Sequence, residues 1–191
     1  SRSSAASDVY KRQILLFGDS LMSGYGLKEN QVLSIILEND LKDAGYNIKV
    51  INGSVSGDTS EDGLDRIEKY VSNSDIDLIV LGLGANDMLR RINPDQTESN
   101  LRKIIEIIKI NNKDIILAGM KASPTNGLAY KKKFDDIFPN LAKEYDLNLI
   151  PFLLKKVALN PKLNQSDGIH PNYEGAKVIS ETIKESIIKL D

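Results

Sequence analysis

The sequence predicts an α/β protein in which a parallel β-sheet lies between two layers of helices. Short apolar runs of strand length alternate along the chain with longer segments whose apolar residues recur at helical spacing. The apolar runs contain few polar residues, which is typical of strands that are buried on both faces, as in parallel sheets. The 191 residues, 41% of them hydrophobic and 27% charged, suit one globular domain with a full core.

The elements alternate strictly between the two patterns. Apolar runs predict strands at residues 14–17, 48–51, 76–83, 114–120 and 147–152. Helical spacing predicts helices at residues 31–44, from Thr59 or Ser60 to Val71, and at 94–112, 128–145 and 173–190. Five alternations without a repeat or a linker imply right-handed crossovers with helices on both faces. We therefore predict a three-layer α/β/α sandwich, flavodoxin-like, with about five parallel strands.

Boundary residues support several of these helices. Gly45 follows the first helix as a plausible C-terminal cap, and Thr59 or Ser60 can cap the second at its start. The segment from Thr97 to Asn100 offers a weak start signal for the third helix. Pro139 is expected to interrupt or kink the fourth.

Residues 1–13 (SRSSAASDVYKRQ) lack apolar periodicity and resemble an in-frame translation of a transposon-type sequencing adaptor. We expect this segment to be non-native and exclude it from the fold. The predicted domain is therefore 14–191. A native N-terminus, with any signal peptide, is expected to have stood where this segment now stands.

The composition excludes several classes of function. The chain has no Cys, one His and a net charge of −2. Disulfides, thiolate chemistry and multi-histidine metal sites are thereby excluded, and no positive charge excess favours nucleic acid or an anionic membrane. No apolar stretch has the length of about 18 residues that a membrane span needs. We expect no metal, no cofactor, no nucleic-acid partner and no stable membrane insertion.

Ser20 is the first candidate for chemistry. It lies in Gly18-Asp19-Ser20, just past the carboxyl end of the first predicted strand, where open α/β sheets bind ligands. A serine nucleophile needs a base, and His170 is the one histidine in the chain. Asp167 lies three residues before it and can orient the imidazole ring. The alternative is that His170 is a solvated or capping residue before the last helix.

Acyl transfer by a serine also needs hydrogen-bond donors for the developing oxyanion. Gly57 can offer its backbone N–H without a side chain in the way, Asn86 can offer its side-chain amide, and Ser20 can offer its own N–H. Gly57 can equally be a turn glycine with positive φ, and Asn86 can be an Asx turn or a helix cap.

Four acidic residues stand close to these positions, namely Asp19, Asp58, Asp62 and Asp87. Because no second set of metal-ligating residues accompanies them, we interpret them as hydrogen-bond acceptors that shape the loops.

Four motifs in register give the chain a resemblance to a known family. They are Gly18-Asp19-Ser20, then SGDTS at 56–60, GAND at 84–87 and DGIHP at 167–171. The chain resembles the SGNH (GDSL) hydrolase superfamily, and within it the bacterial acyl-CoA thioesterase I, lysophospholipase and arylesterase group. The resemblance implies a serine esterase or thioesterase with Ser20, His170 and Asp167 as catalytic triad and an acyl-enzyme intermediate. It also favours a periplasmic or secreted location, and we expect a monomer or a weak oligomer.

The resemblance further implies a small-molecule acyl ester or thioester as substrate. Loops at residues 88–97, 121–127 and 153–163 are expected to form the acyl groove, with enough apolar surface for an acyl chain. The candidate substrate-binding residues are Met88, Leu89, Ile92, Leu153, Leu154 and Val157. Two alternatives stay open. One is a carbohydrate O-acetyl esterase of the same superfamily, and the other is a catalytically silent binding module.

Overall fold

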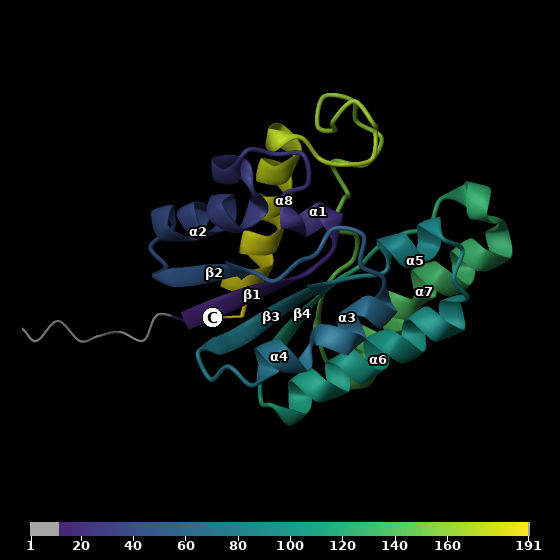
Figure 1. Ribbon diagram of the computed structural model, residues 1–191, viewed down its shortest axis with the longest axis horizontal. Coiled ribbons are helices and arrows are strands. Elements are labelled where there is room, and N and C mark those ends of the chain that lie inside the picture. The colour runs from purple at the N-terminus through teal and green to yellow at the C-terminus, as the bar shows by residue number, and fades with distance from the viewer. Residues whose placement is uncertain (1–11, 191) are drawn as a thin grey trace, which may run out of the picture.

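The computed structural model describes residues 12–190 and contains, within them, a five-stranded parallel sheet. The strands have the order β2-β1-β3-β4-β5, which is the flavodoxin-like order of doubly wound sheets. Their bounds are β1 (Arg12–Gly18), β2 (Ile48–Asn52), β3 (Ile76–Gly82), β4 (Asp114–Ala118) and β5 (Asn148–Ile150). The predicted three-layer α/β/α sandwich is confirmed (Figure 1).

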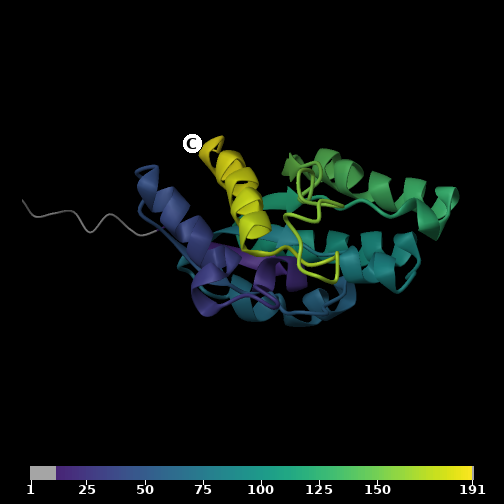
Figure 2. The same cartoon turned by 90° about the horizontal axis from the view of Figure 1, so that it is seen from above.

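Helices cover both faces of this sheet (Figures 1 and 2). They are α1 (Ser20–Ser23), α2 (Leu33–Asp43), α3 (Ser60–Arg66), α4 (Glu68–Val71), α5 (Ala85–Leu89), α6 (Pro94–Ile110), α7 (Leu128–Tyr145) and α8 (Tyr173–Ile188). Two 3-10 turns lie at Glu29–Gln31 and Pro124–Asn126. The apolar sides of α2 and α8 form one core with the sheet, whereas those of α4, α6 and α7 form the other.

The central strand β1 shows why its sequence is an unbroken apolar run. Leu15 and Phe17 point into one core, and Ile14 and Leu16 point into the other. All four side chains are fully buried. Since successive side chains of a strand face opposite sides, a strand covered on both faces needs apolar residues at every position.

Strand β1 begins at Arg12, two residues before the predicted start, because Arg12 and Gln13 pair with Ile48 and Lys49 of β2. These are the last two residues of the predicted non-native segment 1–13. The rest of that segment lies outside the described residues.

Several boundaries differ from the predictions. Thr59 caps α3 as predicted, but the second helix divides at Ile67 into α3 and α4. Helix α6 begins at Pro94, the predicted first residue, and its N-cap is Asn93, so the start signal at Thr97 to Asn100 lies inside the helix. Pro139 lies inside α7 without interrupting it. Across residues 12–190, no helix combines the length and the apolar character that crossing a membrane requires.

Candidate active site

The loops after β1, β2 and β3 lie at the same edge of the sheet, because the three strands are parallel neighbours. The last loop, before α8, reaches the same place. Together they bring Ser20, Asn86 and His170 to the wall of one cavity with a volume of about 480 Å³. Open α/β sheets bind their ligands at such a position, outside the carboxyl ends of the central strands.

Ser20 is held at the end of β1 by a short turn into α1. Asp19 is the N-cap of α1, and its Oδ1 accepts a hydrogen bond of 3.0 Å from the backbone N–H of Leu21. Gly18 before it has no room for a side chain, since a Cβ there would lie 2.7 Å from the carbonyl oxygen of Gly82. The close approach of β1 and β3 thus requires the glycine and fixes where Ser20 emerges.

Ser20, His170 and Asp167 form a hydrogen-bonded chain. His170 Nε2 lies 3.0 Å from Ser20 Oγ, and His170 Nδ1 lies 2.5 Å from Asp167 Oδ2. The other carboxylate oxygen of Asp167 accepts from the backbone N–H groups of Ile169, at 2.9 Å, and His170, at 3.0 Å. The hydrogen bond from the His170 side chain, followed by these two amides, lowers the pKa of Asp167 to about 2.

An ionised Asp167 determines the tautomer of the His170 ring. Its carboxylate can only accept hydrogen bonds, so the tautomer it favours carries the proton on Nδ1 of His170. Nε2 then has a free lone pair directed at the Ser20 hydroxyl. In this geometry His170 Nε2 can take the proton of the Ser20 hydroxyl, which a serine must lose to act as a nucleophile.

A contact that the sequence did not reveal supports His170 from the other side. The Tyr25 ring lies 4.3 Å from the His170 ring, centroid to centroid, with an interplanar angle of 38°. Gln165 Nε2 donates to the carbonyls of Tyr25, at 2.8 Å, and Pro171, at 2.9 Å. It therefore ties the loop after α1 to the His170 loop. Gln165 and Tyr25 are 140 residues apart, and no local pattern marks them as partners.

The predicted oxyanion donors are placed as follows. Asn86 lines the cavity, and its Nδ2 donates one hydrogen to the carbonyl of Asp58 at 2.9 Å. The amide has a second hydrogen that this bond does not use. Gly57 has φ +88°, a conformation that favours glycine although a Cβ would meet no atom within 4 Å. Gly57 does not line the cavity itself, but it directly precedes Asp58.

Asp62 and Asp87, two of the four acidic residues near the site, accept hydrogen bonds from neighbouring segments. Asp87 is fully buried and accepts hydrogen bonds from the backbone N–H of Ser60 (2.8 Å), the Ser60 hydroxyl (2.5 Å) and the Thr97 hydroxyl (2.9 Å). Asp62 accepts from the Thr59 backbone and hydroxyl in a capping box, which lowers its pKa. Within residues 12–190, no group of three or more His, Asp and Glu residues is arranged to hold a metal ion.

Asp19 is the exception among these carboxylates. It is fully buried, and its Oδ2 has no hydrogen-bond partner among the described residues. Burial raises its pKa to about 7, against the lowering effect of the Leu21 amide, and the nearby Asp58 carboxylate raises it further. A carboxyl group that is hard to ionise thus lies directly beside Ser20.

The cavity wall agrees in part with the predicted groove. Met88, Leu89 and Leu154 line it. Leu153 and Val157 are instead buried in the core shared with α2 and α8. Ile92 does not line the cavity either. The sequence did not mark other apolar residues of the wall, namely Leu21, Ala85, Met120, Phe152, Ala158 and Ile169.

The exposed residues Leu159 and Ile169 stand in this wall with 94% and 52% of their surface accessible. The cavity therefore offers accessible apolar surface to a ligand with an apolar part. Lys121 and Lys131 also line the cavity, and the Lys131 ammonium is held by the carbonyl of Ala122 and by Asp135.

Known proteins are similar to this chain in both sequence and fold. Residues 16–178 match the GDSL-like lipase/acylhydrolase family. An arylesterase of Vibrio mimicus is 36% identical over 186 residues, which are 97% of this chain and 92% of that protein. The thioesterase 1/protease 1/lysophospholipase L1 of Escherichia coli K12 is 34% identical over 183 residues, 96% of this chain and 85% of that protein. The psychrotrophic esterase EstA from Pseudoalteromonas sp. superposes with a TM-score of 0.89 at 27% identity, covering 94% of this chain and 98% of the other.

Proposed function

The chain belongs to the GDSL-like lipase/acylhydrolase family, and we propose that it hydrolyses acyl esters through a Ser20–His170–Asp167 triad. It is a carboxylic ester hydrolase, since its relatives are esterases and thioesterases. The observation that carries the proposed triad is the continuous chain of contacts from Ser20 Oγ through His170 to Asp167, at 3.0 and 2.5 Å.

In the acylation step, Ser20 Oγ attacks the carbonyl carbon of the ester while His170 Nε2 takes the hydroxyl proton. The imidazolium that forms is stabilised by Asp167, whose low pKa keeps it ionised. The bond to the leaving group then breaks, and His170 returns the proton to the departing oxygen or sulfur. The products of this step are the free alcohol or thiol and an acyl ester on Ser20.

The tetrahedral intermediate places a negative charge on the former carbonyl oxygen. The proposed donors to it are the N–H groups of Ser20 and Gly57 and the second amide hydrogen of Asn86. Losing one such donor typically costs about 2.7–4 kcal/mol in the barrier. Deacylation repeats the same steps with water, which His170 deprotonates for attack on the acyl-Ser20 ester.

The cavity supports an acyl chain of medium to long length as the part of the substrate that is bound. Its wall is mainly apolar, from Leu21 and Met88 near Ser20 to Leu154 and Leu159 further along. The names of two relatives, an arylesterase and a thioesterase/lysophospholipase, are in keeping with such a wall. A carbohydrate O-acetyl esterase would need mainly polar groups around a sugar, whereas most residues of this wall are apolar.

Covalent labelling tests the nucleophile. EstA is inhibited by monoethylphosphonate in its crystal structure. We expect a fluorophosphonate to label this protein at one serine, located by mass spectrometry at Ser20, and to abolish hydrolysis of a nitrophenyl ester. Ser20→Ala should prevent both labelling and activity. Ser23→Ala is the matched control, because Ser23 lies in the same short helix and its side chain takes no part in the triad.

Chain length tests the substrate class. Nitrophenyl esters from acetyl to hexadecanoyl should give the highest kcat/KM at eight to twelve carbons, about two to three times the length of a butanoyl group. This expectation follows from the gain of about 0.8 kcal/mol for each buried CH₂ group. Strict preference for acetyl esters would contradict the lipid-like substrate, and full activity of Ser20→Ala would contradict the mechanism.

A further inference from the structure

We propose that Arg66 is a positioning residue that sets the geometry of the oxyanion hole by joining the end of β1 to the loop after β2 beneath its donors. This inference rests on the proposed function, because it takes the N–H groups of Ser20 and Gly57 and the Asn86 amide as the donors. Arg66 is the last residue of α3 and does not line the cavity. It acts through the loops beneath the site.

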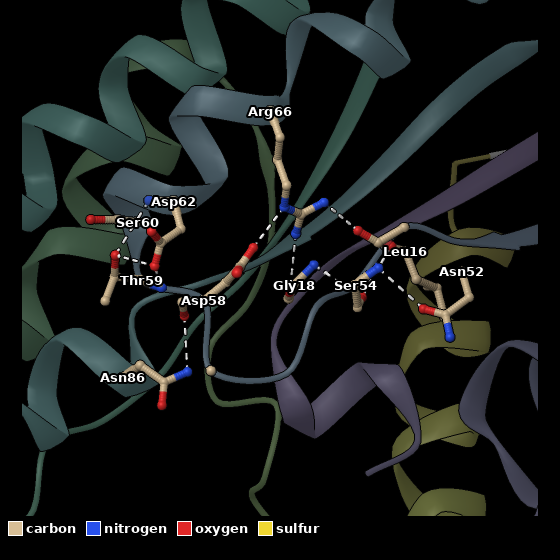
Figure 3. Close-up of polar contacts among 12 residues, drawn as sticks. Leu16, Gly18, Asn52, Ser54, Asp58, Thr59, Ser60, Asp62, Arg66 and Asn86 are labelled. Atoms are coloured by element: carbon tan, nitrogen blue, oxygen red, sulfur yellow. Dashed lines mark hydrogen bonds and ion pairs between the residues drawn. The ribbon is translucent and has the colours of Figure 1, made fainter.

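The Arg66 guanidinium uses each of its three nitrogens on a different residue (Figure 3). Nε donates to Asp58 Oδ2 at 2.6 Å, Nη1 to the carbonyl of Gly53 at 2.5 Å, and Nη2 to the carbonyl of Gly18 at 3.1 Å. Gly53 and Asp58 belong to the loop after β2, whereas Gly18 is the last residue of β1. One side chain therefore spans the ends of two neighbouring strands.

Two of these contacts, those to Gly18 and Asp58, lead to proposed oxyanion donors. Gly18 is two residues before Ser20 in the turn that presents the nucleophile. Asp58 is the residue after Gly57, and its backbone carbonyl accepts the hydrogen bond from Asn86 Nδ2 (Figure 3). The Arg66–Asp58 ion pair thus holds the peptide that carries Gly57 and, through the Asp58 carbonyl, the orientation of the Asn86 amide.

The surroundings make these contacts strong and specific. The Arg66 and Asp58 side chains are 17% and 12% exposed, so water screens the ion pair only weakly. The guanidinium also lies over the Phe17 ring, with Cζ 4.1 Å from the ring centroid. A planar fork with donors in three directions can satisfy all these partners at once, whereas a lysine ammonium, as a compact point charge, cannot.

Other hydrogen bonds keep the loop after β2 attached when Arg66 is lost. The Ser54 hydroxyl accepts from the N–H of Gly18 at 3.0 Å and donates to the carbonyl of Leu16 at 3.1 Å. The backbone N–H of Val55 donates to the Gly18 carbonyl at 3.1 Å. These bonds anchor Ser54 and Val55. The backbone N–H of Asp58 donates to the Val55 carbonyl at 3.2 Å, but none of these bonds holds the Asp58 carboxylate. The effect of removing Arg66 should therefore be confined to the segment that carries Gly57 and to the Asn86 amide.

The test compares Arg66→Met and Arg66→Lys with the unmodified protein and with Arg102→Met. Arg102 is a matched control, since it also forms ion pairs, to Glu98 and Glu144, but on the outer side of α6. Rates on nitrophenyl butanoate are divided by the concentration of sites that a fluorophosphonate titrates. A trifluoromethyl ketone, which adds to the serine and forms an oxyanion, measures the strength of the oxyanion hole directly.

We expect kcat per titrated site to fall about 10- to 100-fold in Arg66→Met, with KM within about threefold, because displaced donors weaken the transition state and not the bound ester. The inhibition constant of the ketone should rise by the same factor as kcat falls. Both values for Arg66→Lys should lie between those of Arg66→Met and the unmodified protein. Both values for Arg102→Met should equal those of the unmodified protein.

A purely structural role would give a different pattern. It would lower the melting temperature and the titratable fraction while leaving kcat per site and the ketone affinity unchanged, and that result would overturn the inference. If Arg66→Met does not fold, Asp58→Asn serves instead, because it keeps the backbone carbonyl and weakens only the charge pair. An inactive Ser20→Ala together with a fully active Arg66→Met would refute the role of Arg66 alone, whereas an active Ser20→Ala would refute the triad.

Discussion

Replacing Asp19 with Asn should change the pH dependence of folding stability. Asp19 is fully buried beside Ser20, and its Oδ2 has no partner among residues 12–190. Burial raises its pKa from 3.8 to about 7. The folded protein therefore keeps a proton on Asp19 over a range of pH in which the unfolded chain has already released it. In that range, raising the pH favours the unfolded chain.

The magnitude follows from the width of this range. Each pKa unit corresponds to about 1.4 kcal/mol. The rise from 3.8 to about 7 therefore lowers the free energy of unfolding by about 4 kcal/mol between pH 4 and pH 7. Below pH 4 the group is protonated in both states and contributes no pH dependence. Above pH 7 it is ionised in both states, and its contribution is constant again.

An asparagine at position 19 cannot ionise and removes this dependence. Its carbonyl can still accept the hydrogen bond from the Leu21 N–H that caps α1. Its amide hydrogens have no acceptor at the place of Oδ2, which adds a penalty of about 1–3 kcal/mol that does not vary with pH. The difference in free energy of unfolding between variant and unmodified protein should therefore rise with pH by about 4 kcal/mol, whatever its starting value.

Urea unfolding at constant ionic strength from pH 4 to pH 8 measures this difference. Asp43→Asn is the matched control, because Asp43 is an exposed aspartate at the end of α2 and its carboxylate stays hydrated. Its difference curve should be flat. Parallel stability curves for Asp19→Asn and the unmodified protein would refute the reasoning, since they would show that Asp19 releases its proton at the same pH in both states.

Three further predictions concern the triad and the cavity. Asp167→Asn should lower kcat by about 10⁴-fold without a matching change in melting temperature, since it removes the group that orients His170 and leaves the fold intact; a loss below about tenfold would contradict this role. Ala158→Trp should narrow the cavity and lower kcat/KM at least about tenfold on dodecanoyl esters while changing it less than about threefold on butanoyl esters, and equal losses on both would argue against an acyl site there. Leu159→Asn should raise the free energy of unfolding by about 1 kcal/mol in urea titrations, because residue 159 has φ +63° and is 94% exposed, while raising KM for long-chain esters; lower stability would show that the Leu159 side chain has a structural role.

The parts of the fold and site that the sequence predicted are those determined by local pattern. Strands covered on both faces need continuous apolar runs, and residues 14–17 and 78–81 are such runs. Ser20 could be singled out because a polar triplet interrupts such a run at its carboxyl end. His170 could be singled out because no other histidine exists in the chain.

Contacts between distant segments could not be predicted in the same way. Arg66 meets Gly18, which is 48 residues away, and its sequence context is that of an ordinary polar position on a helix. Leu153 and Val157 were expected in the groove because they lie in a loop with apolar residues. They turn inward to the core because that loop packs against α8, a contact no local spacing encodes.

Two features that lower stability lie where the chemistry is proposed. At Asp19 lies a buried carboxyl group whose Oδ2 has no partner within residues 12–190. At Leu159 a non-glycine residue with positive φ lies in the cavity wall. Such features persist only where the surrounding structure holds them. Here that structure is β1, whose four apolar side chains are fully buried in two cores, together with the contacts of Arg66 beneath the loops. Replacing Asp19 at neutral pH, or Leu159, should therefore raise the free energy of unfolding and also change the site. Replacing Arg66 should lower kcat more than it lowers stability.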